Sequence, residues 1–285
     1  MRLSGTITPH CYCTAVRMSD SDSEVPGFLL HRAVRKLDVD ALRRALAAGA
    51  NVDALSVSGE TPLYVACHTA PTWPAIGHAV TPGTWKEKIR EREAIVAALL
   101  RAGANVNARY GNPLIASGGM TPLKTAVWDR HGPPSDIVAQ LIAAGADIEA
   151  ADSNGFFPLY TAAQHGRGAT ISQLLAAGAD PHRRLGSFGP TVLEAALSMR
   201  NFHAYAPLVR AGVALPRNSL SATGPALPSS AYLDKIAATP GGFPAYEREH
   251  RRRLTGVFTN KFPMLPVEVI SHIVLLWGHC GDYLH

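Results

Sequence analysis

A short segment in which leucines precede an Ala-Gly pair recurs along this chain, and its recurrence limits the fold more than any other feature. Five copies occur: LRRALAAGANVDA from Leu42, LLRAGANVNA from Leu99, LIAAGADIEA from Leu141, LLAAGADPH from Leu174 and a weaker LVRAGVAL from Leu208. Their glycines are 54, 42, 33 and 34 residues apart. A period of about 33 residues, lengthened by an insertion in the first two units, predicts a linear array of stacked units.

A second signature recurs in phase with the first. It reads GETPLYVAC from Gly59, GMTPLKTAV from Gly119, GFFPLYTAA from Gly155 and GPTVLEAAL from Gly189. Thr61 and Thr121 suit a helix N-cap, and the proline that follows suits the first helical turn. The glycine that closes each copy of the first segment suits a left-handed C-cap, and the Asn or Asp two residues later suits a turn. Each unit is therefore predicted to be a helical hairpin with a connecting turn.

The two signatures together resemble the ankyrin repeat, which reads roughly G-x-T-P-L-H-x-A-A and ends in L-L-x-x-G-A-D-x-N. The resemblance covers about residues 28–215 and implies an all-α ankyrin-repeat α-solenoid of about five helix-turn-helix repeats with short β-hairpin fingers. The expected repeats are 28–54, 55–108, 109–150, 151–183 and 184–215. The first repeat lacks the T-P-L signature, Phe157 replaces the capping threonine of the fourth, and Val192 replaces the proline of the fifth.

The segments outside the repeats differ in composition. We expect a flexible N-terminal segment over 1–27, a linker rich in Pro, Ser, Gly and Ala over 216–245 with one short helix near Tyr232 to Ala237, and a C-terminal helical extension over 246–285. The sequence MLPVEVISHIVLLWGH from Met264 resembles the opening of an F-box over about 15 residues. Two interpretations follow: a helix that caps the last repeat, or a tail that recruits a cullin-type ubiquitin ligase.

Two of the four tryptophans, Trp73 and Trp85, lie in an insertion between His68 and Arg90. Pro71, Pro74 and Pro82 argue against a continuous helix before Trp85. The tryptophans either fold back on the repeats or form a binding loop, because tryptophan is enriched at interface hot spots.

Composition and motifs argue against several classes of function. The net charge of +5 is spread out, and the basic run REHRRR at 248–253 is read as a solvated helix face without an aromatic platform for nucleic acid. No uncharged apolar stretch is long enough to span a membrane, and no signal peptide is recognised, so we expect a cytoplasmic or nuclear protein. The four cysteines form no CxxC pair, and no catalytic or phosphate-binding motif occurs. We therefore expect no cofactor, no metal and no enzymatic activity.

In ankyrin proteins the first helices and the fingers line a concave surface that binds other proteins. The resemblance thus implies a monomeric scaffold that binds an unidentified protein, centred on Trp128, Phe156 and His165 and flanked by the inserted loop. The partner-binding residues implied by matching positions, together with the two tryptophans of the insertion, are Val57, Ser58, Glu60, His68, Trp73, Trp85, Met120, Trp128, Asp129, Ser153, Asn154, Phe156, Gln164, His165, Phe188, Ser198 and Met199.

Overall fold

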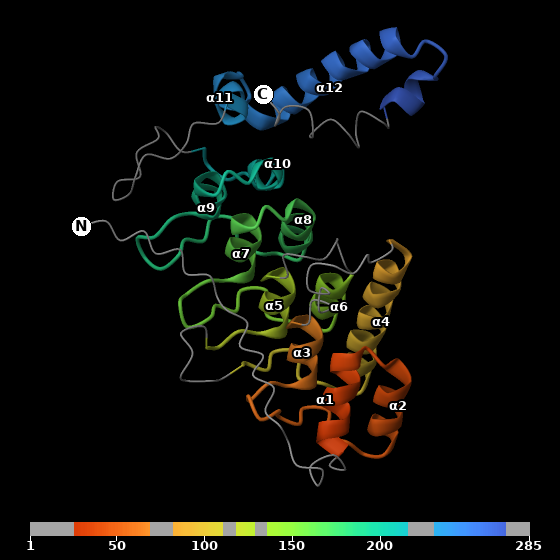
Figure 1. Cartoon of the computed structure of the whole chain (residues 1–285). Coiled ribbons are helices and arrows are strands. Elements are labelled where there is room, and N and C mark those ends of the chain that lie inside the picture. Colours follow the sequence, from red (N-terminus) through yellow and green to blue (C-terminus); the bar gives the residue numbers. More distant parts are fainter. Residues whose placement is uncertain (1–25, 69–81, 111–117, 129–135, 216–230, 272–285) are drawn as a thin grey trace, which may run out of the picture.

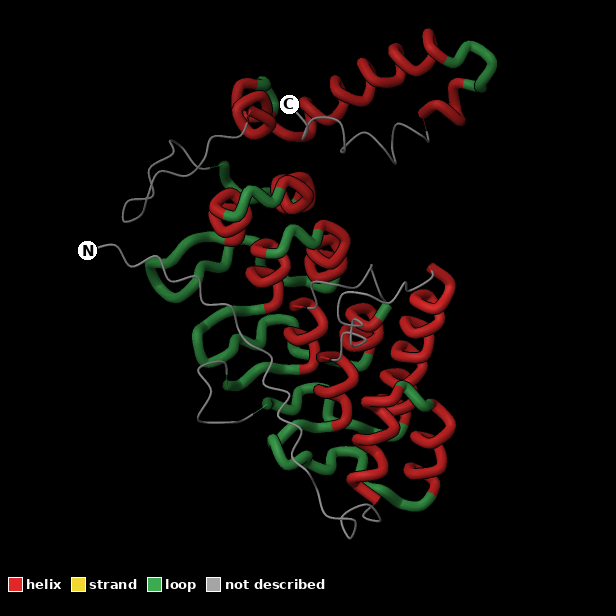
Figure 2. Tube along the Cα trace, in the orientation of Figure 1, coloured by secondary structure: helices red, strands yellow, loops and turns green. Residues whose placement is uncertain are grey.

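The computed structural model describes residues 26–68, 82–110, 118–128, 136–215 and 231–271, and these residues form helices joined by loops (Figure 2). The helices are α1 (Pro26–Lys36), α2 (Val39–Ala47), α3 (Pro62–His68), α4 (Pro82–Arg101), α5 (Pro122–Trp128), α6 (Ile137–Ala143), α7 (Pro158–Gln164), α8 (Gly168–Ala176), α9 (Val192–Ser198), the 3-10 helix η2 (Phe202–Ala204), α10 (Tyr205–Arg210), α11 (Ala231–Ala238) and α12 (Gly242–Lys261). The all-α prediction is confirmed for these residues.

The first ten α-helices pair as five consecutive hairpins that stack in one row (Figure 1). The first helices α1, α3, α5, α7 and α9 contact one another in that order, and so do the second helices α2, α4, α6, α8 and α10. A single apolar core runs through the row from Leu30 to Val213 and continues into α11 and α12. Each hairpin therefore buries its apolar faces against its neighbours.

The helix starts follow the capping residues seen in the sequence. The Oγ1 atoms of Thr61 and Thr121 accept hydrogen bonds from the N–H groups three residues later, at 3.2 and 3.3 Å. Thr191 forms a complete capping box with Glu194. Phe157 makes no side-chain cap; instead its ring is buried, with the Arg183 guanidinium 4.3 Å from the ring centroid. Helix α7 thus starts as predicted, but its first turn is held by packing.

The helix ends repeat one geometry five times. The glycines that end the second helices, Gly49, Gly103, Gly145, Gly178 and Gly212, have φ between +82° and +96°. In each copy the glycine N–H and the next N–H bond back to carbonyls of the last helical turn, as Gly145 does to Ile142 and Ala146 does to Leu141. Glycine tolerates this left-handed conformation without a Cβ clash, so the predicted C-caps are confirmed.

The loops that join one hairpin to the next, here called connecting loops, bond to each other along the row. The side chains of Asp53, Asn107 and Glu149 occupy equivalent positions in three of them. They accept hydrogen bonds from the N–H groups of Asn105, Asp147 and Asp180 in the following loop, at 3.0, 2.8 and 2.8 Å. These bonds fix the spacing of consecutive loops.

The predicted β-hairpin fingers are not seen in the described residues. The loops there hold only two isolated antiparallel bridges, Tyr110 with Met120 and Arg184 with Thr191. Elsewhere a tight turn takes the place of a ladder, as in the bond from the Asp152 N–H to the Phe156 carbonyl at 3.0 Å. Strand pairing needs several residues on each side, and these loops are too short to supply them.

The C-terminal helices cover the last hairpin. Helix α12 contacts both α10 and α11. Arg210 of α10 donates to Glu247 at 2.7 Å and lies 5.8 Å from the Phe243 ring centroid. The short helix predicted near Tyr232 to Ala237 is confirmed as α11, whereas α12 begins at Gly242, inside the predicted linker. Figure 1 shows that the rest of α12 continues past the stack.

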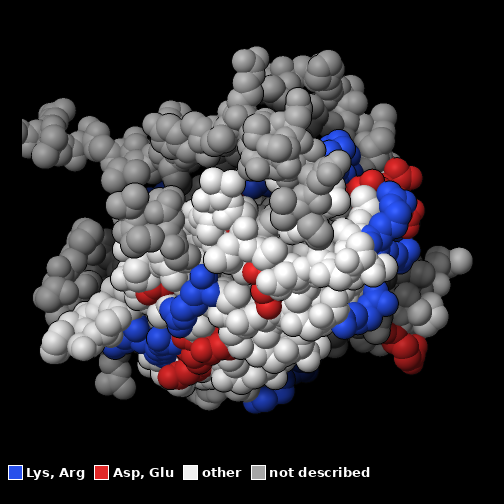
Figure 3. All heavy atoms as spheres, turned by 90° about the horizontal axis from the view of Figure 1, so that it is seen from below, with Lys and Arg blue, Asp and Glu red and all other residues white. Residues whose placement is uncertain are grey.

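The opposite end of the stack presents charged side chains of both signs (Figure 3). Arg43 and Asp40 of α2 pair there at 3.5 Å, and both side chains are exposed. Among the helices that the structure describes, none combines the length and the apolar character needed to cross a bilayer.

His31 joins the first hairpin to the loop that follows it. Its Nε2–H donates to the Ala54 carbonyl at 2.7 Å, while Nδ1 is buried and has no hydrogen-bond partner in the described part of the chain. Burial lowers the pKa of His31 below its ordinary value; the bond to Ala54 and the charge of Glu60 oppose this shift, and the charge of Arg35 adds to it. A protonated ring would place a second N–H where no acceptor lies.

We predict that His31 makes the fold less stable in mild acid. Because its pKa is lower in the folded chain, the unfolded chain binds more protons as the pH falls below about 6.5, so the free energy of unfolding decreases there. The His31→Gln variant keeps a side-chain N–H donor but cannot titrate. Urea denaturation at about pH 7 and about pH 5 should show that the free energy of unfolding falls less for this variant than for the parent chain. Parallel profiles for the two chains would contradict the prediction.

Candidate functional site

The predicted partner-binding residues come from two places in each hairpin: the C-terminal end of the first helix and the connecting loop before it. Their exposure varies. The exposed ones are Val57, Ser58, His68, Trp128, Ser153, Asn154, Phe188, Ser198 and Met199. The half-buried ones are Glu60, Phe156, Gln164 and His165. Trp73, Asp129 and the side chain of Trp85 lie outside the described residues.

The prediction that Met120 contacts a partner is wrong. Its side chain is buried, with 7% exposed, and its backbone pairs with Tyr110 across the loop. The bridge turns Met120 toward the core, so it supports the loop and offers no surface to a partner.

Trp128 and His165 are brought together from adjacent hairpins. Trp128 is the last residue of α5, and His165 follows the last residue of α7. Their ring centroids are 5.7 Å apart at a tilt of 59°. Trp128 keeps 39% of its surface exposed. The contact with His165 therefore holds one side of the Trp128 ring in place, while the rest of the ring stays exposed as an aromatic surface.

Phe156 belongs to a second aromatic group, separate from the pair of Trp128 and His165. Its ring lies 5.5 Å from that of Tyr160 and 5.5 Å from Nζ of Lys124. The predicted single centre of three residues is thus two neighbouring groups, one at the helix ends and one over the buried side chain of Lys124.

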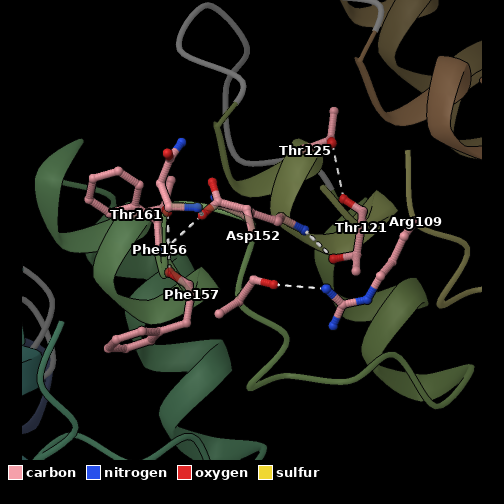
Figure 4. Close-up of polar contacts among 10 residues, drawn as sticks. Arg109, Thr121, Thr125, Asp152, Phe156, Phe157 and Thr161 are labelled. Atoms are coloured by element: carbon pink, nitrogen blue, oxygen red, sulfur yellow. Dashed lines mark hydrogen bonds and ion pairs between the residues drawn. The ribbon is translucent and has the colours of Figure 1, made fainter. Parts of the chain in front are cut away.

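A buried ion pair at Asp152 holds this second group; Figure 4 shows Asp152 beside Phe156. Nζ of Lys124, on α5, bonds to Oδ2 of Asp152, and both side chains are almost fully buried. The other carboxylate oxygen of Asp152 accepts the N–H groups of Asn154 and Phe156, both at 2.9 Å. Burial lowers the pKa of Lys124, and the hydrogen bond and charge of Asp152 oppose that shift. The pair fixes the loop that carries Phe156 against the preceding hairpin.

A third aromatic group lies toward the start of the stack. Tyr64 of α3 stacks on Tyr110 at 4.8 Å and on His68 at 5.8 Å. Burial raises the pKa of Tyr64, so its phenol stays protonated at neutral pH. Tyr110 comes from a connecting loop, so this stack joins a loop to a first helix as the Lys124 pair does.

Arg92 donates hydrogen bonds to backbone carbonyls at the C-terminal end of α3. Its guanidinium donates to the carbonyls of Ala66 at 2.8 Å and of Cys67, and the side chain is buried. Burial raises the pKa of the Cys67 thiol to about 12. The thiol is therefore protonated at neutral pH and belongs to the core, which argues against a role as a nucleophile.

The arrangement offers binding surface more than reactive groups. Within the described ranges, no three His, Cys, Asp or Glu side chains gather closely enough to hold a metal ion. Two of the most exposed large apolar side chains lie on connecting loops: Val57 is 80% exposed and Phe188 is 93% exposed.

The sequence matches no protein-family model and no curated protein.

Lys124 and Asp152 are the central residues that sequence reasoning missed. One signal was present: the position after the signature leucine is Tyr64 and Tyr160 in two copies, Glu194 in the last copy and Lys124 in this one. A lysine in an otherwise apolar helix needs a buried partner, but nothing in the sequence indicates which carboxylate supplies it.

We predict that Lys124→Met lowers the free energy of unfolding by about 3 kcal/mol, because it leaves the Asp152 carboxylate buried without its counterion. The matched control is Arg43→Met, which removes an exposed pair and should change stability by less than about 0.5 kcal/mol. Chemical denaturation measures both. Adding Asp152→Asn to Lys124→Met should recover part of the loss, since the neutral amide oxygen still accepts the two loop N–H groups. Equal changes in the free energy of unfolding for Lys124→Met and Arg43→Met would contradict the role of the buried pair.

Proposed function

We propose that this chain is an ankyrin-repeat protein. The proposal is supported by the fivefold recurrence of one helix end, by capping threonines at the start of three first helices, and by side chains that link consecutive loops at the sequence period. An α-solenoid of this kind stacks helical hairpins so that each covers the next. The short loops here take the place that β-hairpin fingers have in the family.

Its proposed function is to bind a partner protein through the first-helix ends and connecting loops, here called the recognition face. The observation that carries this proposal is the exposure of large apolar side chains there, above all Trp128, Val57 and Phe188. Their exposed surface adds little to the core, and apolar surface of this kind stabilises a complex when a partner covers it. Aromatic residues such as Trp128 are frequent hot spots because they bury a large area with few rotatable bonds.

We predict that the double variant Trp128→Ala, Phe188→Ala loses a protein partner that the parent chain captures from a cell extract. The amount captured should fall about tenfold or more, because hot-spot truncation costs about 2 kcal/mol per residue. The matched control is Phe262→Ala, an aromatic with 42% exposure that lies beyond α12 and away from the recognition face. Circular dichroism checks that each variant is folded. If the variant captured the same proteins as the parent chain, the assignment of this face would be wrong.

A second candidate function is a substrate-recognition subunit of a cullin-type ubiquitin ligase. It is favoured by the exposure of the F-box-like start, where Met264 is 92% exposed and Val267 is 53% exposed. Pro266 directly precedes the helical residues 267–271. Helices α11 and α12 already cover the last hairpin, so these apolar side chains are not required there as a cap.

We predict on this second proposal that Met264→Asp, Val267→Asp abolishes binding to a purified cullin adaptor while the chain stays folded. The buried Ile270 is left in place to preserve the fold. The Trp128→Ala, Phe188→Ala variant is the reciprocal control and should bind the adaptor as the parent chain does. Failure of the parent chain to bind any adaptor would eliminate the ligase role and leave the scaffold role untouched.

A further inference from the structure

The last connecting loop ends in a four-residue tip, Gly186 to Gly189. The tip is closed by the bond from the Leu185 N–H to the Pro190 carbonyl at 3.1 Å and by the bridge between Arg184 and Thr191. Gly186 has φ +64°, and a Cβ on Gly189 would lie 1.9 Å from the Leu185 carbonyl oxygen. The turn therefore requires both glycines, and it places Ser187 and Phe188 at its apex.

Ser187 and Phe188 are free of the core. Phe188 is 93% exposed, and Ser187 is exposed with no hydrogen bond from its hydroxyl to the described part of the chain. A second protein could therefore reach the hydroxyl and the ring without breaking any side-chain contact.

Arg184 stands three residues before Ser187, and its contacts are weak. Its side chain is 51% exposed and lies 4.0 Å from Glu194. One Nη1–H donates to the Gly189 carbonyl at 3.3 Å. Exposed pairs at such distances contribute little to stability, so Arg184 can turn toward another carboxylate with a small loss of free energy. The neighbouring Arg183 is different, because it is bound to Glu149 at 2.5 Å and lies over the Phe157 ring.

We propose that Ser187 is a phosphorylation site for a basic-directed serine/threonine kinase. Such kinases read an arginine three residues before the acceptor with carboxylates of their own cleft, and an apolar side chain after it fits a neighbouring pocket. Arg184 and Phe188 supply these two features. In the reaction Oγ of Ser187 attacks the γ-phosphorus of ATP, the bond from that phosphorus to the bridging oxygen breaks, ADP leaves, and a kinase carboxylate takes the hydroxyl proton.

The structure separates this serine from two competitors with the same spacing. Among the described residues, Thr170 follows Arg167 by three positions, and Thr255 follows Arg252 by three. Thr255 has a further arginine, Arg253, so the linear sequence alone favours it. Both threonines lie inside helices, Thr170 in α8 and Thr255 in α12, and neither is fully exposed. An extended kinase cleft would have to unwind those helices, whereas it only has to open a short tip around Ser187.

A phosphate at Ser187 would regulate the recognition face, and this consequence rests on the proposed function. It adds a dianion beside Phe188 and offers Arg184 a stronger partner than Glu194. A partner that covers Phe188 would have to desolvate that dianion. Phosphorylation is therefore expected to weaken such a complex.

The test treats the full chain with ATP and the purified catalytic subunit of cAMP-dependent protein kinase, and maps the phosphate by tandem mass spectrometry. Phosphate is expected on Ser187, and Ser187→Ala should abolish it. Arg184→Gln should lower the initial rate about tenfold or more, because it removes one charge-assisted contact with the kinase. Thr255→Ala and Thr170→Ala should leave the rate unchanged. Phosphate on either threonine, or none on Ser187, would overturn the proposed site.

A second measurement separates the site from its consequence. The kinase-treated parent chain and the kinase-treated Ser187→Ala variant are compared for partner capture. Weaker capture by the parent alone supports regulation of the recognition face. Equal capture by two chains, one of which carries phosphate, overturns the regulation and leaves the modification established. Loss of capture in the Trp128→Ala, Phe188→Ala variant tests the face itself and does not depend on either result.

Discussion

The first three connecting loops each depend on the loop after them, because Asp53, Asn107 and Glu149 accept backbone N–H groups that belong to the following hairpin. An isolated hairpin would leave those N–H groups to water and both of its apolar faces uncovered. Stability in such an array is a sum over hairpins and the contacts between neighbours. The two ends need separate solutions. Helices α1 and α2 end the row with charged side chains of both signs, and α11 and α12 cover α10.

The centre of the stack adds one strong contact to this periodic pattern. Lys124 and Asp152 lie in adjacent hairpins, and each is the counterion that the other needs in a buried site. The same carboxylate binds two N–H groups of the loop that carries Phe156. The loop can therefore move only if the ion pair also breaks. This part of the recognition face is held more firmly than the loop tip at Phe188, whose side chain is 93% exposed.

The sequence predicts the features that depend on near neighbours along the chain. The capping threonines, the left-handed glycines and the Asn or Asp turns are confirmed because each is decided within about five residues. Apart from the β-hairpin fingers, which the short described loops do not form, the misses depend on contacts between separate segments. The burial of Met120 follows from its bridge to Tyr110, and the partner of Lys124 lies 28 residues away. The first turn of α12 falls in the predicted linker because its Phe243 ring packs on Arg210 of α10, which is distant in the sequence.

On the proposed function, recognition and stability depend largely on different residues of this chain. Val57, Trp128 and Phe188 are exposed, whereas the leucines and alanines of the same hairpins form the core. Substitutions at the exposed positions can change the partner without disturbing the stack, which is why loops on a rigid scaffold serve for binding. Hairpins three and four are the exception, since Phe156 lies over Lys124 and on the loop bound by Asp152. A change of partner that required a different residue at Phe156 would also have to preserve the shielding of the ion pair beneath it, so this position is the least free to vary.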